Sequence, residues 1–427
     1  RTIKEFPLTF ELCSSMNYGE SLAPKKKKEE KKSQLVSFDF RENDITEMIL
    51  AMVNSTINLV ITEAMKEINE YLMFEHLESA SFPYSKPLFY AFRAILRLYS
   101  EKREMASLSI KNIFALLTFD QKLLRKVEFE SFLEDLVECC LVYMKKYELS
   151  SQDNELKEIM QNFNYKFYNA EKTKEVYQEM EPFKVEDLKD ADFETIFIHA
   201  KNNSIYPAGE DENKEEQIEN PADFAKTLVY IMKIIDVALS EIPEFNHQII
   251  TKVLPVLTKF TKHFINSDEN LLLSYLKLTR KCLIDFEDSY AESICLKTLR
   301  QVLDCVMEID LTKSKKNLEL IFRIHSFVNK KIAQLLDNKE KVKDLYNQQL
   351  LYMQKNALDD NIAYLYELFS LIIRIFQDPN VDPQLLQVFN ISLIYNNNLG
   401  IFQFSGYLLQ DYFIFVNSGK TNRRNKY

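Results

Sequence analysis

The strongest constraint on the fold of this chain is a regular recurrence of helix starts in its C-terminal half. One series of candidate starts is Ala222, Asp268, Ser314 and Asp360, each 46 residues after the one before. A second series falls between them and comprises Phe245, Ser289, Asp337 and Pro383. A unit of two helices that repeats at a fixed spacing cannot bury its apolar faces alone, so neighbouring units must stack. The recurrence therefore predicts an all-α chain of stacked helix pairs.

The apolar residues between these starts step by three and four positions, as one face of an α-helix requires. One such stripe comprises Phe224, Leu228, Ile231, Ile235, Ala238 and Ile242. Two further stripes comprise Cys295, Leu299, Val302, Val306, Ile309 and Ile362, Leu365, Phe369, Ile372, Phe376. Pro243, Pro255 and Pro379 interrupt the run, which excludes one long coiled coil. The chain has only five Gly and eleven Pro, whereas sandwiches and barrels use many turns.

The N-terminal half repeats the pattern less regularly. Candidate helices start at Asp44, Ser85 and Ser131, which lie 41 and 46 residues apart, and a further helix is expected from Ser107 to Leu117. Asp44 is expected to cap its helix. A period of 40 to 47 residues is that of HEAT and armadillo repeats. We therefore expect an α-solenoid of antiparallel helix pairs, similar to these repeats and wound into a right-handed superhelix.

Shifts in composition divide the chain into five parts. These are an irregular, lysine-rich leader (1–40), an N-terminal helical-repeat array (41–202), an acidic loop or linker (203–222), a C-terminal helical-repeat array (223–416) and a basic tail (417–427). The first residue is Arg1 rather than Met, so we expect the chain to be a fragment or a processed product.

Two charged segments are the candidate binding elements. The leader carries Lys25, Lys26, Lys27 and Lys28, which read either as a solvated surface loop or as a nuclear localisation signal. The linker carries Glu210, Asp211, Glu212, Glu215, Glu216 and Glu219, which read either as a solubilising linker or as an attractor for a basic partner.

No pattern predicts a catalytic site, a cofactor or a metal. Ser418-Gly419-Lys420-Thr421 resembles the end of a phosphate-binding loop, but Ile414 stands where that loop needs glycine. The five histidines form no zinc motif, and His325 falls on an apolar helix face, which is typical of a hydrogen-bonded core residue. Cys139 and Cys140 are adjacent on one helix and point about 100° apart, so they are expected to pack rather than to bind one metal.

The segment Asn361 to Ile373 combines aromatic and aliphatic residues and ends in Ser-Leu-Ile-Ile. After a Pro-bearing linker, Asn398 to Phe413 opens with Asn-Leu-Gly-Ile and contains Leu-Leu-Gln. This pair of segments resembles late HEAT repeats of karyopherins of the importin-β superfamily. The resemblance implies an α-solenoid that binds protein cargo, with importin-α and Ran-GTP as possible partners. It gives no individual contact residue.

The sequence therefore favours a protein-binding, karyopherin-like transport receptor of cytoplasm and nucleus rather than an enzyme. The alternative is a HEAT or armadillo scaffold or regulatory subunit of a complex unrelated to transport. An enzyme with dispersed catalytic residues is the rival from another class, and no sequence feature supports it. The net charge of −10 disfavours nucleic acid as a partner. The apolar stretch 399–416 is interrupted by polar residues, which favours a buried helix over a membrane span.

Overall fold

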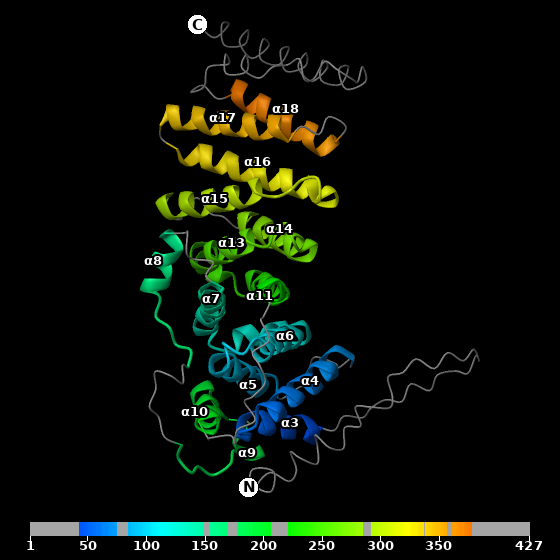
Figure 1. Cartoon of the computed structure of the whole chain (residues 1–427), viewed down its shortest axis with the longest axis vertical. Coiled ribbons are helices and arrows are strands. Elements are labelled where there is room, and N and C mark those ends of the chain that lie inside the picture. Colours follow the sequence, from blue (N-terminus) through cyan, green and yellow to red (C-terminus); the bar gives the residue numbers. More distant parts are fainter. Residues whose placement is uncertain are drawn as a thin grey trace, which may run out of the picture. The chain divides into compact units, whose positions relative to one another are not determined.

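A computed structural model of the chain describes residues 42–74, 84–147, 154–168, 177–188, 190–205, 221–284, 292–336, 338–356 and 361–377. Every regular element within these ranges is a helix, so the predicted all-α class is confirmed (Figure 1). The chain divides into two compact units, unit 1 from Arg1 to Tyr290 and unit 2 from Ala291 to Tyr427.

Unit 1 begins with five α-helices and one 3-10 turn. Their bounds are α3 (Glu42–Asn54), α4 (Asn58–Phe74), α5 (Ser85–Leu98), α6 (Arg103–Phe119), η2 (Gln121–Arg125) and α7 (Phe129–Lys146). The predicted start at Ser85 is confirmed, and the helices expected at Ser107 and Ser131 begin a few residues earlier. Asp44 lies inside α3 rather than at its N-cap, so the predicted cap is wrong.

The remainder of unit 1 has three short helices and then a longer series. Their bounds are α8 (Asn154–Asn162), α9 (Val185–Leu188), α10 (Phe193–Ser204), α11 (Pro221–Glu241), η3 (Pro243–Phe245), α12 (Asn246–Gln248), η4 (Ile249–Val253), α13 (Leu254–Lys262) and α14 (Glu269–Ile284). The starts predicted at Ala222 and Asp268 match α11 and α14 to within one residue. The η4 turn is π-helical, and it lies just before Pro255, whose missing N–H prevents an ordinary helical hydrogen bond.

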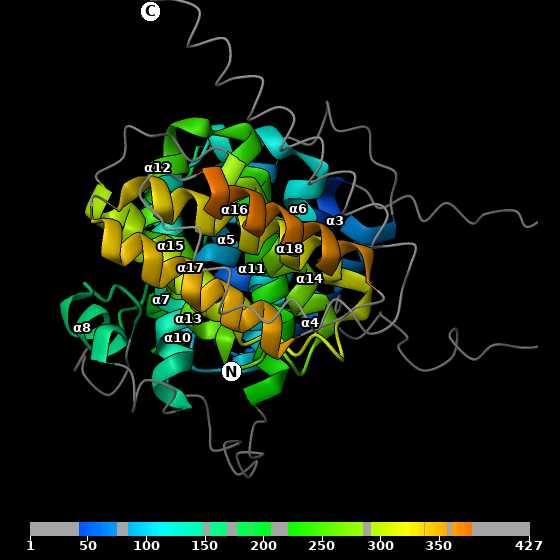
Figure 2. The same ribbon diagram turned by 90° about the horizontal axis from the view of Figure 1, so that it is seen from above.

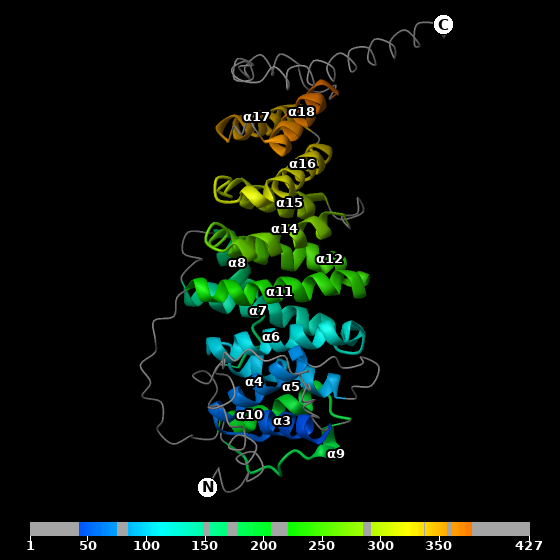
Figure 3. The same cartoon turned by 90° about the vertical axis from the view of Figure 1, so that its right-hand side faces the viewer.

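Four long helices of unit 1 pack in the order α4, α6, α11, α14 (Figure 3). A second set packs beside them: α5 contacts α6, and α13 contacts both α7 and α14. The stripe predicted from Phe224 to Ile242 lies inward along α11, and all six of its residues are buried. Burial of these stripes is what joins one helix to the next, because each buried aliphatic side chain contributes about 1.5–3 kcal/mol.

The segment from α8 to α10 departs from this succession. Helix α10 packs on α3 and α5, near the start of the unit, and α11 then packs on α6. Two asparagine side chains hold the intervening backbone. The Asn54 amide donates to the Phe183 carbonyl and accepts from the Phe183 N–H, both at 2.9 Å. Asn202 pairs with Gln178 in the same way, at 2.7 and 2.9 Å. Figure 2 places α8 at the side of the unit.

Unit 2 is described over four helices and a 3-10 turn. Their bounds are α15 (Glu292–Met307), η5 (Lys315–Asn317), α16 (Leu318–Leu335), α17 (Lys339–Lys355) and α18 (Ile362–Gln377). Helix α16 packs on both α15 and α18, and α17 packs on α18. The starts predicted at Ser289, Ser314, Asp337 and Asp360 fall within four residues of α15, α16, α17 and α18.

Along the sequence, the boundary between the two compact units falls between residues 290 and 291. The sequence-based division places its linker at 203–222 and stays a prediction. Within unit 1, the Phe224 ring at the start of α11 stacks on Tyr143 of α7 with the ring centroids 3.7 Å apart. The leader 1–40, the greater part of the linker (206–220) and the tail 417–427 lie outside the described residues.

Candidate functional site

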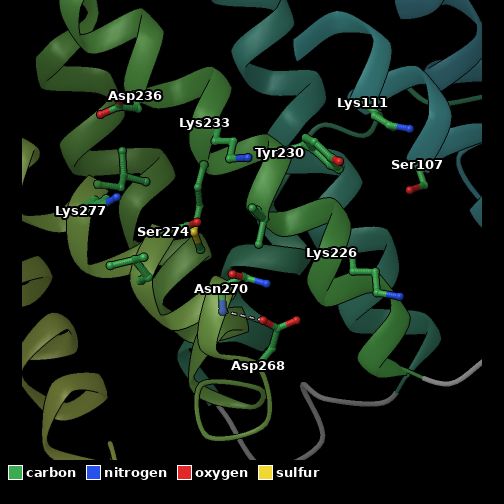
Figure 4. Close-up of a pocket in the computed structure, with 14 residues that line it drawn as sticks. Ser107, Lys111, Lys226, Tyr230, Lys233, Asp236, Asp268, Asn270, Ser274 and Lys277 are labelled. Atoms are coloured by element: carbon green, nitrogen blue, oxygen red, sulfur yellow. Dashed lines mark hydrogen bonds between the residues drawn. The ribbon is translucent and has the colours of Figure 1, made fainter. Parts of the chain in front are cut away.

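A groove of about 900 Å³ opens on unit 1 where α6, α11 and α14 lie side by side (Figure 4). Its lining residues come from all three helices. They are Ser107, Lys111, Lys226, Val229, Tyr230, Met232, Lys233, Asp236, Asp268, Asn270, Leu273, Ser274, Lys277 and Leu278. A groove of this size is within the range of ligand-binding clefts in proteins.

The helical period brings the lining residues of α11 onto one face. Lys226 and Lys233 are seven positions apart, which is two helical turns, and Tyr230 lies between them. This face is opposite the buried stripe, so Lys226 and Lys233 are exposed while the apolar residues enter the core. On α14, Asn270, Ser274 and Lys277 follow the same spacing.

Side-chain contacts fix α11 against α6 at the groove. The Thr227 hydroxyl donates to the Ser107 hydroxyl at 2.9 Å. The rings of Phe114 and Tyr230 pack with their centroids 5.7 Å apart. The Lys233 ammonium lies 5.1 Å from the Phe114 ring and 5.3 Å from the Tyr230 ring, a cation–π arrangement. These contacts hold Lys233 at the wall of the groove.

Both carboxylates of the groove are already engaged by neighbouring groups. Asp236 forms an ion pair with Lys281 at 3.1 Å. Asp268 caps α14, because its carboxylate accepts from the N–H groups of Asn270 and Leu271 at 2.8 and 3.0 Å (Figure 4). Among the described residues, neither carboxylate forms an ion pair with a lysine that lines the groove.

The lysines give the groove a positive charge. Four lysines and two aspartates line it, a difference of two positive charges in a chain whose net charge is −10. No ion pair within the described ranges involves Lys111, Lys226 or Lys277. Met232 and Leu278 are buried at the base, and Val229 and Leu273 are half-buried. The groove therefore combines cationic groups at the rim with an apolar base, an arrangement that can bind an anionic group attached to an apolar one.

A second polar cluster is buried between α5, α7 and α10. Asp135 of α7 accepts from Arg93 Nε at 2.5 Å and forms an ion pair with Arg97 Nη2 at 2.8 Å. Both guanidinium groups lie over the Phe193 ring of α10, at 4.0 and 4.7 Å. The cluster joins α5, α7 and α10, and none of these three charged residues lines the groove.

Glu138, one turn after Asp135, holds an extended segment in place. Its carboxylate accepts from the backbone N–H groups of Lys166 and Phe167 at 2.8 and 2.6 Å. Burial raises the pKa of Glu138 to about 7, although the two N–H groups oppose the shift. The Tyr168 N–H also donates to the Arg97 carbonyl at 3.0 Å. A carboxyl group with both oxygens bound to backbone in this way serves packing.

The prediction that His325 lies in the core is confirmed, since its side chain is fully buried in unit 2. Its ring stacks on Tyr352 with the centroids 4.8 Å apart, and Nδ1 lies 3.8 Å from Glu367 Oε1. Arg374 binds the same carboxylate oxygen at 2.8 Å. Neither ring nitrogen of His325 has a hydrogen-bond partner in the described part of the chain, so the expected hydrogen bond is not seen there.

Cys139 and Cys140 are buried free thiols. Burial raises the pKa of Cys140 to about 12 and that of Cys139 well above its usual value. Both thiols are therefore protonated at neutral pH and poor nucleophiles. Across the described residues, no group of three or more His, Cys, Asp or Glu side chains is placed to hold a metal ion. None of the helices searched there is both long and apolar enough to cross a bilayer.

The structure places none of the sequence-predicted binding residues. The acidic residues Glu210, Asp211, Glu212, Glu215, Glu216 and Glu219 and the lysines Lys25, Lys26, Lys27 and Lys28 lie outside the described residues. The lysine groove was missed by sequence reasoning. The spacing of Lys226 and Lys233 was visible, but nothing in the sequence indicated that α11 packs against α6 across the interruption from α8 to α10.

Comparison with protein-family models, with curated proteins and with solved structures found no significant match to this chain.

Proposed function

We propose that this chain is a protein-binding α-solenoid, formed by HEAT- or armadillo-like antiparallel helix pairs wound into a right-handed superhelix. The observation that carries the proposal is the groove on unit 1 where α11 packs between α6 and α14. Stacked helix pairs leave their outer helix faces available as one extended surface, and such surfaces bind other proteins. The four lysines and two aspartates of the groove suit the binding of a charged partner.

The leading identity is a karyopherin-like transport receptor that shuttles between cytoplasm and nucleus, with importin-α and Ran-GTP as possible partners. Two observations support it. The first of the two segments that resemble karyopherins is Asn361 to Ile373. From Ile362 onward it lies in α18, an α-helix as the resemblance requires. The net charge of −10 suits basic cargo. The second segment, Asn398 to Phe413, lies outside the described residues.

The second candidate is a HEAT or armadillo scaffold or regulatory subunit of a complex unrelated to transport. The path of the chain from α7 to α11 favours it. Helix α10 returns to α3 and α5 before the series resumes at α11 on α6, whereas a uniform repeat array would add each helix to the one before.

Capture experiments with purified proteins separate the two candidates. The immobilised chain is incubated with importin-α, with and without Ran loaded with a non-hydrolysable GTP analogue. A transport receptor of the proposed kind retains importin-α only when loaded Ran is present. Absence of both proteins from the bound fraction would contradict this identity and leave the scaffold.

A further inference from the structure

We propose that the lysine groove between α6, α11 and α14 binds an acidic segment of a partner polypeptide in an extended conformation that crosses the three helices. This inference rests on the proposed protein-binding function and names the chemistry of the partner. Its first support is the placement of the cationic groups. Lys111 belongs to α6, Lys226 and Lys233 to α11, and Lys277 to α14 (Figure 4).

The separation of the helices sets the length of the bound segment. Packed helices lie about 8–10 Å apart, so the lysines of α6 and α14 are separated by two such steps, roughly 20 Å. An extended chain rises about 3.3 Å per residue, so about six residues span that distance. Side chains two and four residues apart lie on one face of such a chain, so carboxylates at these spacings meet the lysines of neighbouring helices.

The rest of the lining suits a polypeptide. Val229 and Leu273 are half-buried in the lining and can contact an aliphatic side chain placed between two acidic residues. Ser107, Asn270 and Ser274 lie at the rim and offer donors and acceptors to a peptide backbone. The combination favours short acidic sequences that also contain leucine or isoleucine.

The charge of the groove argues against nucleic acid as the occupant. Nucleic-acid sites gather many Lys and Arg residues along a backbone path. This groove has four lysines, no arginine and two aspartates, in a chain with a net charge of −10. An acidic peptide carries fewer charges than a nucleic-acid strand of the same length, and it also supplies the apolar side chains that the apolar lining can contact.

The test uses the full chain and a fluorescent peptide of sequence EELEELEE, with QQLQQLQQ as the neutral control. Binding is followed by fluorescence anisotropy at low and at physiological ionic strength. The groove variant is K226E/K277E, because both lysines are exposed and belong to none of the ion pairs described above. The matched control is K122E/K252E, which changes two exposed lysines outside the groove and alters the net charge equally.

The acidic peptide is expected to bind the wild-type chain, and the neutral peptide at least about tenfold more weakly. K226E/K277E lowers affinity for the acidic peptide by about tenfold or more, whereas K122E/K252E keeps it within about twofold. Circular dichroism establishes that each variant is folded. If K226E/K277E is unfolded, the neutral pair K226Q/K277Q takes its place.

Equal loss in the groove and control variants would overturn the proposal, since the effect would then come from net charge alone. Tighter binding of a single-stranded oligonucleotide than of the acidic peptide, with the same dependence on Lys226 and Lys277, would also overturn it. A third outcome separates this inference from the protein-binding function. If the peptide does not bind, and K226E/K277E captures importin-α or another partner as strongly as the wild-type chain does, the inference is wrong and the protein-binding function still holds.

Discussion

Individual buried charges in unit 1 are stabilised by partners on other helices. Asp135 is fully buried and bound by Arg93 and Arg97, and both arginines lie over Phe193. Burying charges in this way costs desolvation energy, so the pairs are weak as a net source of stability. Removal of one charged partner nevertheless lowers the free energy of unfolding strongly, because the remaining charges stay buried without it.

Asp135→Ala is expected to lower the free energy of unfolding by about 3–5 kcal/mol, because two buried guanidinium groups lose their shared carboxylate. Urea unfolding followed by circular dichroism measures this change. Glu181→Ala, which removes an exposed partner of Lys184, is the control and should have little effect. A loss for Asp135→Ala no larger than that of the control would show that the cluster is hydrated in solution.

Glu138 predicts a dependence of stability on pH. Its pKa is raised from 4.5 in an unfolded chain to about 7 in the folded state, chiefly by burial. The folded state thus holds this proton more tightly, so its stabilising effect is complete below about pH 4.5 and is lost as pH rises through about 7. A shift of this size is worth on the order of 3 kcal/mol.

Glu138→Gln removes the titration and keeps one accepting oxygen, while its NH2 group replaces the other oxygen and faces one of the Lys166 and Phe167 N–H groups. The fall in thermal unfolding temperature between pH 5 and pH 8 should therefore be smaller in this variant than in the wild-type chain. Identical falls in the two proteins would mean that Glu138 is not the group that titrates.

At the level of helices, the contact between α6 and α11 determines the candidate site. Ser107 and Thr227 join them by a hydrogen bond of 2.9 Å, and Phe114, Tyr230 and Lys233 pack beside it. Other local features also set the path of the chain between helices. The π-helical turn Ile249–Val253 leads into α13, and the side chains of Asn54 and Asn202 bind the backbone that precedes α9.

The double variant S107C/T227C is expected to form a disulfide under mild oxidation, because the two hydroxyl oxygens that the sulfur atoms replace are in contact. Peptide mapping without reductant identifies the cross-linked peptides, and each single variant serves as a control. If the two introduced thiols stay reduced while the protein remains folded, α11 does not pack on α6 in this register.

Helix stripes could be predicted from the sequence, whereas the site could not. Phe224 to Ile242 step regularly along one face, and a local period of this kind survives any tertiary arrangement. The groove depends on long-range packing, because Lys111 of α6 and Lys226 of α11 line it together only when α10 returns to α3 and α11 packs on α6. Asp135 was equally unpredictable, since its arginine partners lie about forty positions away.

Over the whole chain, an acidic sequence segment and a basic groove are the candidates for binding. The sequence has a net charge of −10, and six acidic residues are concentrated between Glu210 and Glu219. The lysine groove of unit 1 is lined by four lysines and two aspartates, so its charge is positive whereas the net charge of the chain is negative. Charges of this kind steer encounters with partners of complementary charge, and their effect falls as salt increases.

Neutralising the six acidic residues by glutamine and asparagine is expected to weaken binding of a basic peptide, KKLKKLKK, by about tenfold at low ionic strength. The thermal unfolding temperature should be unchanged, because Ile218 is the only aliphatic residue between positions 209 and 219. Fluorescence anisotropy measures the binding. Equal affinity of the two proteins for the basic peptide would identify the segment as a solubilising linker only.

The central claim is that the chain binds other proteins and that the surface of α6, α11 and α14 takes part. Its most direct test compares the proteins captured from extract by the wild-type chain, by K226E/K277E and by K122E/K252E, with each bound protein quantified by mass spectrometry. The account predicts a defined set of partners, held equally by wild type and control and lost from the groove variant. The same partners at the same levels on all three proteins would contradict a role for this surface.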